Sequence, residues 1–86
     1  MPKYIVKIRF EQRHPYADYW EYQTDYLQYE YSIYSKRYYP SIQLNAYATK
    51  FRNKMQARIA FARWKRIQDE LYADIHKNIT SKVLKI

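Results

Sequence analysis

Hydrophobic and polar residues alternate near the start of the chain. Over residues 3–10, one side of the pattern carries Tyr4, Val6, Ile8 and Phe10, and the other carries Ile5, Lys7 and Arg9. This period of two is typical of a strand with one buried face. The segment from Glu11 to Asp18 contains Pro15, which cannot donate to a ladder, so we expect a connection there.

A second alternating region covers residues 19–34 and is rich in tyrosine. It predicts a hairpin with strands over about 19–24 and 26–34 that turns at Thr24-Asp25. A helix over 16–34 is the alternative, because several of these tyrosines are also three or four residues apart. The preference of tyrosine for strands favours the hairpin.

The second half of the chain combines a strand pattern with a helix signal. We expect a turn over Ser35–Pro40, a strand over 41–49 and a helix over about 53–77, which Asn53 would cap with Gln56 three residues on. The apolar stripe of this helix would face a sheet, and it consists of Ala57, Ala60, Phe61, Trp64, Ile67, Leu71 and Ile75.

These elements predict one α+β domain over residues 1–86. We expect an antiparallel sheet of three or four strands that one long C-terminal helix covers on one face. Residues 79–86 alternate imperfectly, so they either add an edge strand or form a basic tail. An exposed edge strand could also pair with its copy in a homodimer.

Composition excludes several classes of function. The chain has no cysteine and no glycine, so disulfides, thiolate nucleophiles and glycine loops that cradle phosphate are absent. Its apolar stretches are far shorter than the roughly 20 residues that cross a bilayer, and no secretory signal follows Met1. We therefore expect a protein of the cytoplasm that has no membrane partner.

The titratable residues do not predict an enzyme. His14 and His76 are far apart, and neither has a partner at the spacing of a metal site or a catalytic triad. The cluster Asp69, Glu70 and Asp74 is typical of a solvated helix face. We expect no catalytic residue, no metal and no cofactor.

The excess of positive charge indicates an anionic partner. Sixteen Lys and Arg stand against eight Asp and Glu, and residues 46–86 hold ten of these cations with three acids. Along the predicted helix, Lys54, Arg58 and Lys65 fall in one row. The candidate residues for binding DNA, RNA, a nucleoprotein complex or another acidic partner are Lys50, Arg52, Lys54, Arg58, Arg63, Lys65 and Arg66.

Tyrosine is the second unusual feature, with nine of the twelve lying between Tyr16 and Tyr39. Because tyrosine offers a large contact area at a small rotamer cost, it is enriched at protein interfaces. Candidate aromatic contacts are Tyr26, Tyr34, Tyr38 and Tyr39. These residues support a second hypothesis, in which the tyrosine-rich surface binds a host protein.

The stretch Ala48-Thr49-Lys50-Phe51, together with the strand Tyr4–Ile8 and the aromatic hairpin, resembles small phage and prophage accessory proteins. These have an aromatic hairpin, an Ala-x-x-Phe strand end and a basic helix. The resemblance implies a protein of the host cytoplasm that regulates phage DNA or inhibits a host defence nuclease, as anti-CRISPR and anti-restriction proteins do. The chain is also similar to the arm-type DNA-binding domains of phage integrases, whose sheet enters the major groove. Here residues 18–34 carry no Lys or Arg, so we expect contact through the helix.

Overall fold

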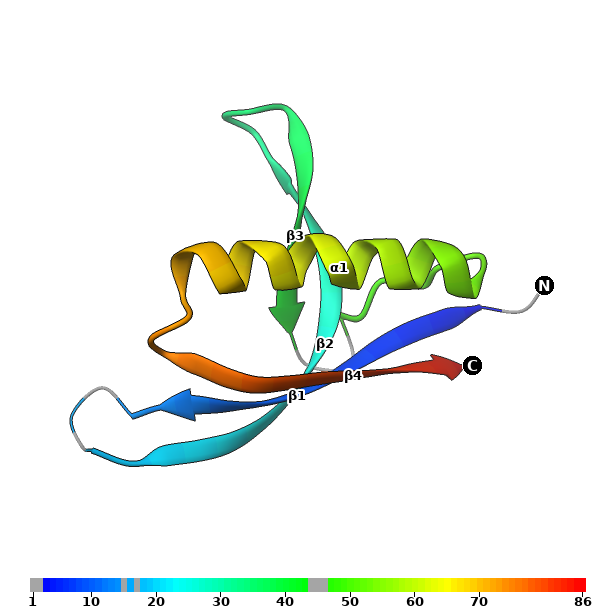
Figure 1. Cartoon of the computed structure of the whole chain (residues 1–86). Coiled ribbons are helices and arrows are strands. Elements are labelled where there is room, and N and C mark those ends of the chain that lie inside the picture. Colours follow the sequence, from blue (N-terminus) through cyan, green and yellow to red (C-terminus); the bar gives the residue numbers. More distant parts are fainter. Residues whose placement is uncertain (1–2, 15, 17, 44–46) are drawn as a thin grey trace.

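The chain forms an α+β fold in which one helix packs against an antiparallel sheet of four strands (Figure 1). The computed structural model describes residues 3–14, 16, 18–43 and 47–86. In the sheet the strands lie in the order β3-β2-β1-β4. The elements in chain order are β1 (Tyr4–Arg13), β2 (Trp20–Ser32), β3 (Arg37–Gln43), α1 (Lys54–Leu71) and β4 (His76–Lys85).

Strand β2 is continuous, so the predicted hairpin with a turn at Thr24-Asp25 is wrong. Both residues belong to the ladder with β1, where Thr24 lies opposite Arg9 and Asp25 lies opposite Ile8. Thr24-Asp25 contains no glycine, which two-residue hairpin turns of types I′ and II′ usually have at one of their central positions. The first half of β2 pairs with β1 and its second half pairs with β3.

The connection from β2 to β3 is shorter than predicted and covers residues 33–36, so the expected turn over Ser35–Pro40 is wrong in its bounds. Lys36 adopts a positive φ of 56° and donates its backbone N–H to the Ser32 carbonyl at 2.8 Å, and β3 starts at the next residue. Pro40 therefore lies inside β3, where its missing N–H is tolerated because β3 is an edge strand. The predicted strand over 41–49 is also wrong in its bounds, since β3 covers 37–43 and residues 47–49 are not in a strand. Its residues 44–46 lie outside the described part.

The helix begins where the sequence predicts and ends earlier. Oδ1 of Asn53 accepts the backbone N–H of Gln56 at 2.9 Å, which confirms the N-cap. The predicted end near residue 77 is wrong, because the helix stops at Leu71. The chain then turns so that His76 can pair with Gln12 at the start of β4, and this pairing outweighs helix propensity.

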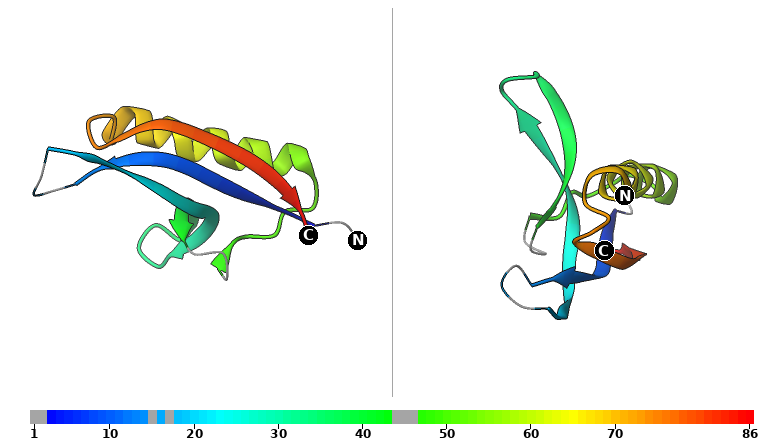
Figure 2. Two further views of the ribbon diagram at one scale, coloured as in Figure 1. Left: turned by 90° about the horizontal axis from the view of Figure 1, so that it is seen from below. Right: turned by 60° about the vertical axis from the view of Figure 1, so that its left-hand side comes forward.

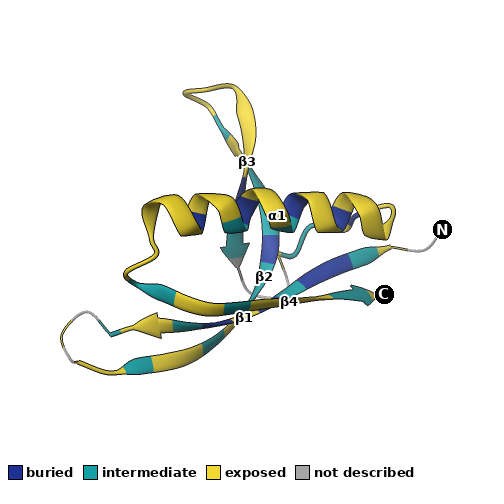
Figure 3. Cartoon of the chain, in the orientation of Figure 1, coloured by how far each residue is buried: buried dark blue, intermediate teal, exposed yellow. Residues whose placement is uncertain are grey.

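The main core lies between α1 and the strands (Figure 3). The helix contributes Ala57, Ala60 and Trp64, which confirms that the tryptophan faces inward. Ile67 and Leu71, predicted to be buried, are 37% and 67% exposed, and Ile75 lies beyond the helix. Gln68 is buried in their place, so the buried stripe is rotated and narrower than the apolar pattern suggests. The residues that pack against the helix include Val6, Ile8, Phe10 and Leu27.

The C-terminal segment is an edge strand, which was one of the two alternatives for residues 79–86. It starts at His76 and pairs with β1 from Gln12 back to Tyr4, with an irregularity between Arg9 and Glu11. Figure 2 shows the long β4 alongside β1 and the β2–β3 hairpin extending away from the rest of the sheet. Ile5 was placed on the outward side of β1 and is nevertheless buried, opposite Leu84 of β4.

Candidate functional site

The helix brings together only part of the predicted set of cations. At 100° per residue, Lys54, Arg58 and Lys65 lie within about 40° of one another around the helix axis. Lys54 and Arg58 are exposed, and so are Lys50 and Arg52 in the segment that leads into α1. The first turn of the helix carries no acidic residue. We call Lys50, Arg52, Lys54 and Arg58 the helix-start cations.

The other three predicted cations lie near side chains that interact with them, two in ion pairs and one beside an aromatic ring. Nζ of Lys65 lies 2.7 Å from Oδ2 of Asp69, and Nε of Arg66 lies 3.2 Å from Oε1 of Glu70. These surface pairs contribute little to stability, but they reduce the positive potential on the C-terminal half of the helix. Arg63 lies on another side of α1, with its guanidinium 6.0 Å from the ring centre of Tyr29. The seven cations therefore do not form one continuous row.

Three of the four predicted tyrosines gather on the β2–β3 hairpin. Tyr34 is 94% exposed at its tip, and Tyr38 and Tyr39 follow on β3. The hydroxyl of Tyr39 donates to Oε2 of Glu30 at 2.7 Å, and this hydrogen bond raises the pKa of Tyr39. Tyr26 lies apart from them, where β2 passes from one partner strand to the other, opposite Lys7 of β1.

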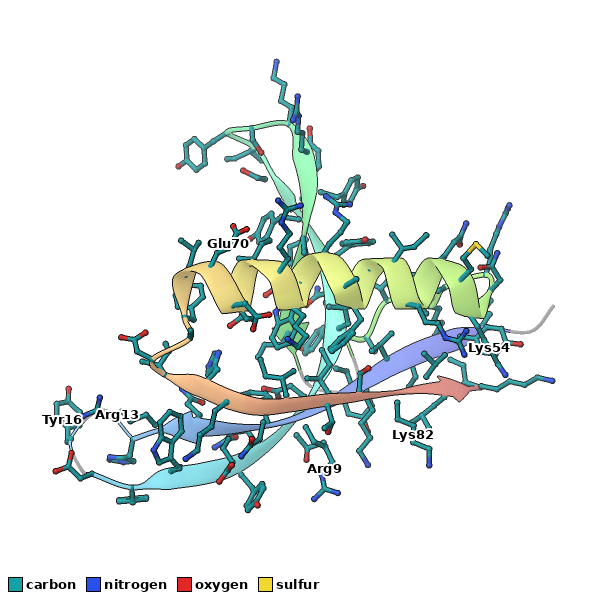
Figure 4. All side chains as sticks on the ribbon, in the orientation of Figure 1. Arg9, Arg13, Tyr16, Lys54, Glu70 and Lys82 are labelled. Carbon is teal, nitrogen blue, oxygen red and sulfur yellow. The ribbon has the colours of Figure 1, made fainter. Side chains whose placement is uncertain are left out.

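A second basic surface was missed by the sequence reasoning. In β1, Lys7 and Arg9 alternate with the buried Ile8 and Phe10, so they project from the side of the sheet that faces away from α1. Figure 4 shows the side chains of Arg9 and Lys82 pointing away from the helix. We call this surface the open face and define it by Lys7, Arg9, Glu11, Trp20, Tyr22, Thr24, Tyr26, Lys77, Thr80 and Lys82.

The register of the strands places cations beside aromatic residues on the open face. Lys7 lies between Tyr26 of β2 and Lys82 of β4, and Arg9 lies between Thr24 and Thr80. Alternation predicted that Lys7 and Arg9 face outward. No local signal in the sequence indicated that β4 would bring its own lysines next to them.

Between α1 and β3 lies a shallow hollow whose lining includes Tyr39, Tyr72 and His76, and no carboxylate is among its described lining residues. Nδ1 of His76 lies 2.6 Å from Oε1 of Gln68, and burial lowers the pKa of His76. Over the described ranges, no cluster of three or more His, Cys, Asp or Glu has the arrangement of a metal site.

No family model, no curated protein and no solved structure shows a significant match to this chain. Within the described part of the chain, no helix combines the length and apolar character that crossing a membrane requires.

Proposed function

We propose that this protein is a non-enzymatic accessory protein, of the phage or mobile-element type that its sequence resembles, which binds DNA, RNA or a nucleoprotein complex. The observation that carries the proposal is the cluster of helix-start cations. They are exposed, and in the described structure none of them forms an ion pair. The positive end of the helix dipole adds to their field, so the most electropositive end of α1 is available to a phosphate backbone.

The proposal predicts a strong dependence on salt, because bound phosphates release counterions. If all four helix-start cations contact phosphates, the slope of log K against log salt is about −3.6 for duplex DNA and about −2.8 for a single strand. Raising the salt from about 50 to about 200 mM should then weaken binding by roughly 50- to 150-fold.

The test is fluorescence anisotropy with labelled duplex and single-stranded oligonucleotides. The double variant Lys54→Glu/Arg58→Glu should lose well over tenfold in affinity. The matched control is Lys36→Glu/Arg37→Glu, which makes the same change in net charge at the β2–β3 turn and should bind more strongly than the test variant. Binding that does not depend on salt, or an equal loss in both variants, would contradict the proposal.

A second candidate function is inhibition of a host defence nuclease through protein contact, in the manner of anti-CRISPR or anti-restriction proteins. It is favoured by the projecting β2–β3 hairpin, where Ile33, Tyr34 and Tyr38 are all exposed (Figure 1). Exposed apolar groups gathered on one segment are typical of an interaction surface. Capture of a host protein that survives nuclease treatment and is lost in Tyr34→Ser/Tyr38→Ser would support this function over the first.

A homodimer is the remaining proposal about partners. The sheet order leaves β3 and β4 at its two edges, and an exposed edge can pair with a copy of itself. Pro40 removes one donor from β3, so β4 is the better edge for such pairing. Sedimentation equilibrium measures the mass directly, and a mass equal to one chain at high concentration would exclude the dimer.

A further inference from the structure

We infer that the open face is a binding surface for single-stranded nucleic acid, on which bases stack on Tyr22 and Tyr26 while Lys7, Arg9 and Lys82 contact the phosphates. This inference rests on the nucleic-acid binding proposed above and assigns it a second surface and a ligand class. It rests on the charge, the aromatic exposure and the strand register of the open face.

The charge of the open face matches a polyanion. It carries the cations Lys7, Arg9, Lys77 and Lys82, and none of them forms an ion pair with a described residue. The acid between them is Glu11, which accepts a hydrogen bond from the side chain of Asn78. The cations therefore outnumber the acid by four to one around β1.

The register also places two like charges side by side. Lys7 and Lys82 are directly opposite each other on neighbouring strands, an arrangement that costs stability when no anion lies between them. A phosphate bound over this pair would remove the repulsion. The lysine pair is therefore a specific location for one backbone phosphate.

The aromatic residues are suited to unstacked bases. Tyr22 is 77% exposed and Tyr26 is half-buried on the same face of β2, and the two are about 14 Å apart along the strand. Arg9 lies beside Thr24, which is midway between these tyrosines. An extended strand could thus place a base on each ring and a phosphate near the guanidinium that lies between them.

Trp20 has a supporting role. Nζ of Lys77 lies 4.2 Å from the centre of its ring, a cation–π contact between the end of β4 and the start of β2. One face of the indole is therefore covered, and the contact holds Lys77 over the open face. For this reason Tyr22, rather than Trp20, is the ring whose removal tests stacking.

A single strand fits this surface better than a duplex does. Stacking on a tyrosine requires a base whose π-face is accessible, which a single strand offers and a closed duplex does not. Stacking is also tolerant of sequence, so the surface needs no hydrogen-bond donors aimed at base edges. The open face offers aromatic rings for the bases and lysine and arginine side chains for the phosphates.

The experiment measures anisotropy of a labelled oligothymidine of about 16 nucleotides, with unlabelled duplex as competitor. Tyr22→Ala should weaken binding roughly tenfold, whereas Tyr22→Phe keeps the ring and should stay near the parent protein. Tyr16→Ala is the aromatic control, since Tyr16 is even more exposed than Tyr22 but lies in the β1–β2 connection (Figure 4). Arg9→Gln/Lys82→Gln should reduce the salt slope by about 1.4.

The outcomes separate this inference from the proposed function. If Lys54→Glu/Arg58→Glu abolishes binding while Tyr22→Ala and Arg9→Gln/Lys82→Gln bind normally, the helix-start site stands and the open face is excluded. If the duplex competes as well as unlabelled single strand, the stacking mode is wrong. If no variant and no probe shows binding, both proposals fail. Circular dichroism of each variant confirms that it is folded, which we expect because the substituted side chains lie on the surface.

Discussion

Replacing Trp64 by alanine should destabilise the fold severely, because this side chain is the largest buried group of α1. It is only 2% exposed and its ring centre lies 6.4 Å from that of Phe10 and 6.1 Å from that of Phe61. Truncating a buried tryptophan to alanine typically costs about 3–5 kcal/mol. A chain of 86 residues has a total stability of roughly 4–13 kcal/mol, so the change removes a large share of it.

Leu71 provides the matched control on the same helix. The apolar pattern assigned both residues to the core, but Leu71 is 67% exposed, so Leu71→Ala should change the free energy of unfolding by no more than about 0.5 kcal/mol. Trp64→Phe keeps an aromatic ring and should fall between the two. Urea unfolding followed by circular dichroism measures all three variants. Equal losses for Trp64→Ala and Leu71→Ala would refute the assignment of the buried stripe.

Three further predictions concern single residues. Burial lowers the pKa of His76, so as the pH falls the unfolded state binds this proton before the folded state does. Protonation of His76 should therefore not reduce the free energy of unfolding above about pH 6.5, and that free energy should decrease as the pH falls below this value. Urea midpoints at about pH 7.5 and about pH 5.5 should differ less in His76→Gln than in the parent, and an equal difference would contradict this. Burial raises the pKa of Asp25, so its carboxylate opposes folding once it is charged, and Asp25→Asn should raise the thermal midpoint near pH 7 but much less near pH 4. Lys36 has a positive φ that glycine adopts at no steric cost, so Lys36→Gly should stabilise the fold by up to about 1 kcal/mol in the same thermal assay; a lower midpoint would argue against strain at this turn.

Only part of the candidate site could be predicted from the sequence, because some of its residues are brought together by contacts between distant parts of the chain. Helical spacing placed Lys54 and Arg58 together, because one turn of a helix is a local property of the sequence. The same spacing of four residues lets Lys65 reach Asp69, which reduces the contribution of Lys65 to that surface. The pairing of Lys7 with Lys82 depends on residues 75 positions apart, and no local pattern reports such a contact.

The sequence alone determined the features that depend on nearest neighbours. The alternation around Val6 and Ile8 produced β1, and the side chain of Asn53 determined where α1 begins. Tertiary structure decided the rest, because β1 pairs with another strand on both of its edges. Pairing with β1 and then with β3 keeps β2 continuous. Pairing of residues 76–85 with β1 places the C-terminal segment in the sheet, so α1 ends before it, at Leu71. The open face follows from that last pairing, since its cations come from opposite ends of the chain.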